Sequence, residues 1–226
     1  MKTKNNIHLL ETIFKIKMFF LKPSNNTMKK FLSPLFLGIA ALALFTVSCS
    51  KSEDAPVYDA EGQFKTDSTL LKNYVDSKYP NAQYDSEKGI WYEILAEGEG
   101  NYQYKIVDTL NAKLFKVQPT VKYTGRLLNG SIFDQTETDK TASFEILTNT
   151  GYYYPFESTI IPAWTFAFAP KKIGDLKLGG LTEKGLQKGS KIHIMVPSKW
   201  GYANRAMGKI PANSPLDFVI EVVDIK

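Results

Sequence analysis

The sequence predicts an α+β domain that is built mainly on antiparallel strands. Three observations lead to this fold class: short runs of β-branched and aromatic residues alternate with polar ones, an Asn-Gly pair marks a tight turn after one such run, and only two segments have helical character. Of the 226 residues, 43% are apolar, which is enough for one sizeable core or for one domain with an anchor and a linker.

The first ordered element expected is a short amphipathic helix over residues 67–78. Its apolar residues recur at helical spacing: Leu70, Leu71, Tyr74 and Val75. Asp67 or Ser68 is available as the N-cap, and the helix ends before Pro80. The preceding stretch, residues 49–65, begins with polar residues that lack periodicity, and we interpret it as a tether.

Four segments have strand character, and one of them leads into a hairpin. They cover residues 90–95, 116–124, 190–197 and 216–225. After the second segment, Asn129-Gly130 is the strongest short hairpin signal in the chain. In the third, Ile192 and Ile194 share one face, so His193 is expected to face out of the strand, and no role is assigned to it.

A second helical segment is expected to begin near Trp164. Residues 164–169 are apolar, Pro170 interrupts them, and a glycine-rich stretch follows over residues 174–189. Domain organisation follows from these elements: a leader and signal segment at 1–48, the tether at 49–65, a short helical extension at 66–89 and the main domain at 90–226.

The positive charge of the chain is concentrated at its N-terminal end. Residues 1–48 contain seven of the 28 Lys/Arg residues and a single acid, Glu11. From Cys49 onward, 21 basic residues face 22 acidic ones, so this part has a net charge of −1. No basic stripe remains there to neutralise phosphates, which argues against nucleic acid as a partner.

The segment from Met28 to Ser50 has the three parts of a secretory signal. Met28-Lys29-Lys30 is cationic, residues 31–47 form a 17-residue uncharged run, and small residues follow around Cys49. A cysteine at this boundary resembles the bacterial lipoprotein signal, in which it becomes the lipidated first residue. The resemblance implies an exported lipoprotein, anchored in the outer membrane through Cys49 and facing the periplasm or the cell surface. Because Met28 begins a complete signal by itself, we expect the true start at Met28.

Two other interpretations of this segment stay open. The apolar run is an uncleaved membrane anchor, although it is short for a full span, or Cys49 is an ordinary residue after a conventional signal. In all three cases the body of the protein leaves the cytoplasm. With Cys49 as the only cysteine and His8 and His193 as the only histidines, the sequence offers no Cys/His metal cluster and no nucleophile–histidine pair.

The segment Val121–Asp134, with the sequence VKYTGRLLNGSIFD, resembles the signature of FKBP-type peptidyl-prolyl cis-trans isomerases. Further blocks resemble the family in the same order: Ile160-Ile161-Pro162-Ala163-Trp164, Gly185–Lys191, Val196–Ala203, Ile210–Asn213 and Leu216–Val222. The resemblance covers roughly residues 90–226 and implies an antiparallel sheet wrapped around a short helix. Departures include insertions in loops, above all between Trp164 and Gly189, next to the helix that lies under the family's pocket.

The resemblance also implies an apolar pocket for a proline ring. Its catalytic residues are Tyr123, Phe133, Asp134, Ile161, Trp164, Tyr202 and Phe218. Trp164 is the expected floor, Asp134 orients the Tyr123 hydroxyl, and the Tyr202 hydroxyl and the Ile161 backbone N–H are expected to bind substrate carbonyls. Phe144, Ile160 and Ile210 are expected to assist substrate binding. Without the motif, Phe133, Phe144 and Phe218 would be interpreted as core residues.

The implied function is prolyl isomerisation (EC 5.2.1.8) that assists the folding of exported proteins. It requires no metal or cofactor, and its partners are proline-containing polypeptide segments and a lipid bilayer. The alternative is a non-catalytic lipoprotein module that captures proline-containing peptides within a secretion or motility assembly. The aromatic cluster at residues 152–156 is a loop packed on the domain or a lip of the peptide site.

Overall fold

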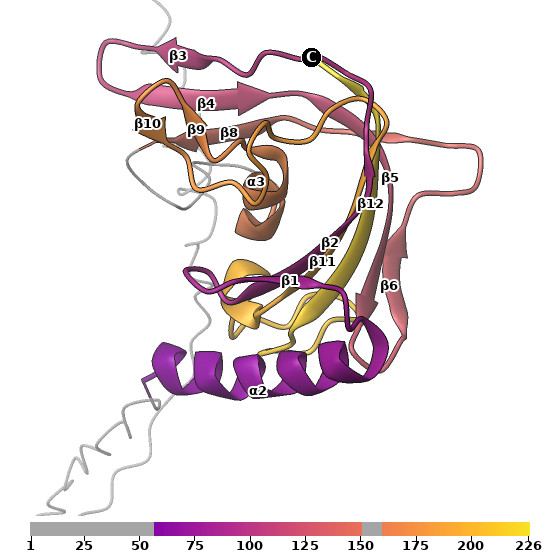
Figure 1. Cartoon of the computed structure of the whole chain (residues 1–226). Coiled ribbons are helices and arrows are strands. Elements are labelled where there is room, and N and C mark those ends of the chain that lie inside the picture. The colour runs from indigo at the N-terminus through magenta and orange to yellow at the C-terminus, as the bar shows by residue number, and fades with distance from the viewer. Residues whose placement is uncertain (1–56, 151–159) are drawn as a thin grey trace, which may run out of the picture. The chain divides into compact units, whose positions relative to one another are not determined.

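The computed structural model describes residues 57–150 and 160–226 (Figure 1). The signal segment, Cys49 and the aromatic cluster at 152–156 lie outside these residues, so their predicted roles stay predictions. Within the described residues, no helix combines the length and the apolar character needed to cross a bilayer.

A seven-stranded sheet forms the frame of the domain, and every strand pair in it is antiparallel. Its strands pair in the order β1 (Gln83–Asp85), β2 (Ile90–Glu97), β11 (Ser190–Val196), β12 (Leu216–Ile225), β5 (Pro119–Leu127) and β6 (Ile132–Gln135), and β7 (Ala142–Ser143) also pairs with β5. This sheet confirms the predicted α+β class and contains most of the four predicted strand segments. Of the segment 116–124, however, Lys116 and Val117 lie in β4 (Lys113–Val117), which belongs to a smaller sheet.

Two smaller antiparallel sheets extend the domain. One contains β3 (Ile106–Asp108), β4 (Lys113–Val117) and β8 (Ile146–Asn149) in that order. The other is a hairpin of β9 (Lys172–Ile173) and β10 (Leu176–Lys177), within the insertion that follows Trp164.

The predicted hairpin at Asn129-Gly130 joins β5 to β6. The N–H of Leu127 donates to the carbonyl of Ser131 at 3.0 Å, and the N–H of Gly130 donates to the carbonyl of Leu127 at 2.8 Å. Gly130 has a φ of 90°, a conformation that a residue with a Cβ rarely adopts. Glycine at this position therefore sets the turn that brings β6 back along β5.

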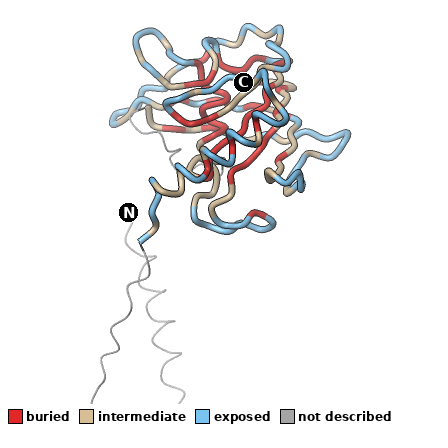
Figure 2. Tube along the Cα trace, turned by 60° about the horizontal axis from the view of Figure 1, so that its bottom comes forward, coloured by how far each residue is buried: buried red, intermediate tan, exposed pale blue. Residues whose placement is uncertain are grey.

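The short helix α3 (Pro162–Phe168) lies on the concave side of the curved main sheet (Figure 1). Pro162 fits the first helical position, where its missing N–H costs nothing. The residues from Ala163 to Phe168 are all buried, and the helix packs in the same apolar core as Ile192 and Ile194. The helix ends at Phe168, and Ala169 is its C-cap, so it stops before Pro170 as predicted. Figure 2 shows that the buried residues gather in the interior of the domain, and that the exposed residues lie mostly in its outer loops.

The N-terminal helix α2 (Ala60–Lys78) begins earlier than the sequence pattern indicates. Its N-cap is Asp59, whose side chain accepts from the N–H of Gly62 at 2.8 Å. The expected cap, Asp67, is instead fully buried within the helix. The prediction that residues 60–65 belong to a tether is therefore wrong; they form the first turns of α2, and their polar side chains point mostly to solvent.

The expectation for His193 needs a correction as well. It does lie on the face opposite to Ile192 and Ile194, but this second face is not open to solvent. The ring of Tyr79 covers His193 in an edge contact with the ring centroids 4.4 Å apart, and only 4% of His193 is exposed. A second, smaller apolar cluster, formed by Leu71, Val75 and Met195, lies between α2 and the sheet.

Candidate functional site

An aromatic cleft opens between α3, strands β5, β6 and β12, and the loop that carries Tyr202. Its volume is about 180 Å³. Ten residues line it: Tyr123, Phe133, Asp134, Ala142, Phe144, Ile160, Ile161, Trp164, Tyr202 and Phe218. Nine of these ten are residues that the sequence analysis assigns to the site. Asp134 is the only charged residue among the ten.

Trp164 on α3 is the residue around which the other rings gather. It is 5% exposed, and its ring meets those of Tyr123 and Phe144, each at a centroid distance of 5.1 Å, in edge contacts. Phe218 adds a third edge contact at 5.7 Å. Such tilted arrangements place the positive edge of one ring against the negative face of another. They leave an apolar hollow above the indole instead of a closed stack.

Gly125 on β5 makes room for two of these rings. A Cβ at this position would lie 2.6 Å from Cζ of Phe133 and 2.9 Å from Cε1 of Phe218. Both distances are shorter than real contacts allow, so any side chain here would push the rings apart. Glycine therefore permits the edge contact of Phe133 with Phe218, whose centroids are 5.6 Å apart.

A short hydrogen bond joins two polar groups of the cleft. The hydroxyl of Tyr123 donates to Oδ2 of Asp134 at 2.5 Å, across the β5–β6 hairpin. Burial, and then this bond and the negative charge of Asp134, raise the pKa of Tyr123 well above its usual range. Burial, followed by the charge of Asp134, also raises the pKa of Tyr202. Tyrosine hydroxyls ordinarily keep their protons at neutral pH, and the raised pKa values extend this protonated range to higher pH. The proton of Tyr123 is donated to Asp134.

Ile160 and Ile161 form the part of the cleft wall that leads into α3. Ile161 is the N-cap residue, with an extended backbone (φ −71°, ψ 149°), and its carbonyl accepts from the N–H of Trp164 at 3.1 Å. The following proline favours this extended conformation. The local sequence Ile-Ile-Pro therefore places an extended segment next to the indole of Trp164, in the first turn of α3.

A comparison with family models identifies the domain to which this site belongs. The model described as "FKBP-type peptidyl-prolyl cis-trans isomerase" matches residues 116–223. These residues form an FKBP-type domain. The matched segment contains every residue that lines the cleft.

Curated relatives of this chain carry related names. The chain is 34% identical over 128 residues to "Outer membrane protein MIP" of Legionella longbeachae; the aligned segment covers 55% of this chain and 44% of that protein. It is 28% identical over 142 residues to "FKBP-type peptidyl-prolyl cis-trans isomerase FkpA" of Escherichia coli (strain K12), covering 62% of the chain and 39% of the relative. The match thus spans less than half the length of each of these relatives. Among solved structures, the crystal structure of FkpA from Escherichia coli has a TM-score of 0.48 and 24% identity, with 74% of this chain and 62% of that chain covered.

One residue assigned to substrate binding, Ile210, does not line the cleft of the FKBP-type domain. It is 5% exposed and belongs to the main apolar core, and it pairs with Met207 through two backbone hydrogen bonds of 2.9 Å. The geometry gives it a packing role. Conversely, Ala142 on β7 lines the cleft although the sequence analysis does not name it; a lone alanine carries no chemical signal that would single it out.

The insertion after Trp164 packs behind α3 and leaves the cleft open. The N–H of Leu181 donates to the carbonyl of Phe166 at 2.9 Å, and that of Leu186 donates to the carbonyl of Phe168 at 3.3 Å. The insertion thereby covers carbonyls on the helix, and none of residues 170–189 lines the cleft. Among the described residues, no group of three His, Cys, Asp or Glu side chains is arranged to bind a metal ion.

Proposed function

We propose that this protein catalyses the cis-trans isomerisation of Xaa-Pro bonds in exported polypeptides, with the proline ring bound over Trp164. The observation that carries the proposal is the cleft itself. It is small, it is lined by five aromatic side chains besides Trp164, and it lies within the segment that matches the isomerase family.

The chemistry of the reaction suits such a cleft. Rotation about the Xaa-Pro amide has a barrier of about 20 kcal/mol and takes tens of seconds or longer without a catalyst. The planar amide is polar because its resonance separates charge between oxygen and nitrogen, and the twisted transition state loses this resonance. An apolar site with little water therefore favours the twisted form over the planar one, without any acid or base.

Each residue of the cleft has a proposed role in this reaction. Trp164 supports the proline ring from below, and the surrounding rings exclude water. The Tyr202 hydroxyl, which keeps its proton at neutral pH, donates to a substrate carbonyl at the rim. The Ile161 N–H binds the carbonyl beside the rotating bond. Asp134 fixes the Tyr123 hydroxyl and gives this end of the cleft a negative charge.

Export and lipid attachment are part of the proposal. They are supported by the signal-like segment from Met28 to Ser50 and by the name of the Legionella longbeachae relative, an outer membrane protein. Mass spectrometry of the protein purified from membranes tests the anchor: a mature N-terminus at Cys49 carrying acyl chains supports it, and an unmodified Cys49 contradicts it.

The isomerase activity is tested by measuring cis-trans exchange in short peptides that contain one Xaa-Pro bond, using the full-length protein in detergent. The expected result is an acceleration that saturates with peptide concentration and is lost in Trp164→Ala. A correctly folded protein that binds these peptides without accelerating exchange would overturn the enzymatic proposal and leave the non-catalytic peptide-binding module.

A further inference from the structure

The buried carboxylate of Asp67 connects α2 to the loop that carries Tyr202. Asp67 is 0% exposed. Its Oδ2 accepts from the backbone N–H of Ser198 at 2.7 Å and from the hydroxyl of the same serine at 2.5 Å. Its Oδ1 accepts from Nε2 of Gln63 at 2.7 Å. A charged acceptor thus receives two hydrogen bonds from one residue that lies 131 positions further along the chain, an arrangement that fixes Ser198 closely.

Ser198 in turn fixes the backbone on both sides of Tyr202. It begins the 3-10 helix η1 (Ser198–Trp200), and its carbonyl accepts from the N–H of Gly201 at 2.9 Å and from the N–H of Ala203 at 2.8 Å. Ala203 has a φ of 51°, which is unfavourable for a residue with a Cβ. Such a conformation persists only where surrounding contacts enforce it. The place of Tyr202 therefore depends on how Ser198 is bound.

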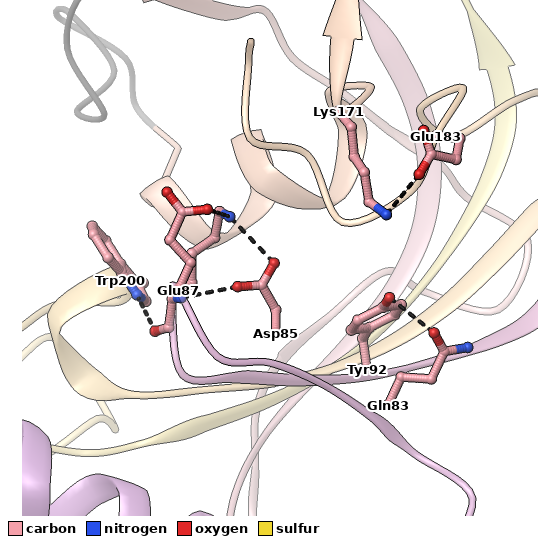
Figure 3. A network of polar contacts seen from close by, with 8 residues as sticks. Gln83, Asp85, Glu87, Tyr92, Lys171, Glu183 and Trp200 are labelled. Atoms are coloured by element: carbon pink, nitrogen blue, oxygen red, sulfur yellow. Dashed lines mark hydrogen bonds and ion pairs between the residues drawn. The ribbon is translucent and has the colours of Figure 1, made fainter.

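Further contacts hold the same turn against α2 and against the turn between β1 and β2. Nε1 of Trp200 donates to the carbonyl of Lys88 at 2.8 Å, and Figure 3 shows this bond beside Glu87. The ammonium group of Lys199 lies 3.5 Å from the ring centroid of Phe64 on α2. These contacts hold the last two residues of η1 from two sides, whereas Asp67 binds its first residue, Ser198.

The helix that supplies Asp67 lies outside the segment matched by the family model, which begins at residue 116. A buried carboxylate such as that of Asp67 is unusual where a helix only packs on a sheet, because burying a carboxylate is costly unless it is fully hydrogen-bonded. An apolar residue at this position would suffice to dock α2 on the sheet. What a carboxylate adds is a fixed acceptor for the N–H and hydroxyl of Ser198.

We propose that Asp67 is a positioning residue for the isomerase: by binding Ser198 it sets the place of Tyr202 at the rim of the cleft. The inference rests on the proposed function for the role of Tyr202 toward a substrate, and the geometry of the loop itself can be tested without it.

The test compares the Asp67→Ala variant with the wild type by two measurements, both on full-length protein in detergent. Removing the carboxylate leaves the N–H and hydroxyl of Ser198 buried without their acceptor, so kcat/KM for a short peptide with one Xaa-Pro bond is expected to fall about tenfold. Amide hydrogen exchange, followed by mass spectrometry, is expected to become faster in residues 198–204. Asp67→Asn keeps an oxygen acceptor, so its kcat/KM and its exchange rate in residues 198–204 should lie between those of the alanine variant and the wild type. The same variant serves for both measurements if Asp67→Ala does not fold.

Two controls separate positioning from a general loss of stability. Asp76→Ala makes the same change on the same helix at an exposed carboxylate that pairs with Lys72, and neither measurement should change. In a Tyr202→Phe background, Asp67→Ala should lower kcat/KM by less than about twofold, because both changes act through one hydroxyl.

Losses that add in full in the double variant would overturn the proposal, and so would an unchanged exchange rate in residues 198–204 of folded Asp67→Ala and Asp67→Asn proteins. If the wild-type protein does not accelerate isomerisation, the proposed function fails. The exchange measurement still decides whether Asp67 sets the position of the Tyr202 loop.

Discussion

The hydroxyl of Tyr74 donates a 2.6 Å hydrogen bond to Oδ2 of Asp217, which joins α2 to strand β12. Asp217 is 1% exposed, and Nε2 of His193 lies 3.0 Å from its other carboxylate oxygen. The next residue along the strand is Phe218, whose side chain points to the opposite face and lines the aromatic cleft. One strand thus carries a polar contact with α2 on one face and a wall of the candidate site on the other.

The first prediction concerns the stability that this bond provides. Tyr74→Phe removes one partner of a buried carboxylate, so the free energy of unfolding is expected to fall by about 1.5–3 kcal/mol. Urea unfolding measures the change. Tyr84→Phe, at a tyrosine that is 47% exposed on β1, is the matched control and should leave stability unchanged. Equal stability of the Tyr74 variant and the wild type would show that the bond contributes nothing.

The second prediction is a loss of stability at high pH. The pKa values of Tyr74, Tyr123 and Tyr202 are raised, in each case with burial as the first cause. In the unfolded chain these hydroxyls lose their protons near pH 10, while the folded protein retains them, so the unfolded state binds fewer protons and stability falls as pH rises above about 10. Below that value the contribution of these groups is complete and constant.

Unfolding experiments between pH 8 and 11 measure this decline, with ~0.5 unit steps. Because the decline is a sum over several groups, the informative comparison is with Tyr123→Phe, whose free energy of unfolding should fall less steeply above pH 10. Parallel curves for the variant and the wild type would contradict a raised pKa of Tyr123.

The third prediction addresses the polar end of the cleft. Asp134→Ala removes the acceptor of the Tyr123 hydroxyl and the charge beside Tyr202, so kcat/KM for Xaa-Pro exchange is expected to fall about tenfold. Asp134 is exposed, and stability should therefore change little. Asp139→Ala, an exposed carboxylate in the next loop, serves as control and should retain full activity. Full activity of the Asp134 variant would mean that this residue takes no part in the reaction.

Most of the sheet and most of the cleft could be predicted from the sequence, for local reasons. Alternation and the Asn-Gly pair are properties of neighbouring residues, and they suffice for β11, β12 and the β5–β6 hairpin. The cleft residues could be predicted because they fall in short sequence blocks that resemble one family and occur in the same order as in that family. The insertion after Trp164 had no such pattern, and its hairpin β9–β10 could not be predicted.

The errors have one common cause, which is contact between distant parts of the chain. Asp67 has the usual signature of an N-cap, and only its hydrogen bonds to Ser198 show why it is buried. His193 has the alternation of an outward-facing residue, but α2 and the segment after it cover that face. Ile210 stands in a block that resembles the family; its side chain lies in the main core, and its assignment to substrate binding stays a prediction.

The last prediction tests whether the cleft depends on the absence of a side chain at Gly125. In Gly125→Ala the new methyl group would lie within 3 Å of both Phe133 and Phe218, so the rings must move into the cleft or away from each other. Unfolding free energy is expected to fall by about 1–3 kcal/mol, and peptide affinity should fall with it. Gly130→Ala is the matched control: its φ of 90° makes alanine unfavourable, but no atom outside Asn129, Gly130 and Ser131 lies within 4 Å of the added carbon. This control should lose stability and keep its affinity for a proline peptide, as measured by the fluorescence of the tryptophans. If both variants keep their affinity, the contact of Phe133 with Phe218 does not shape the binding site.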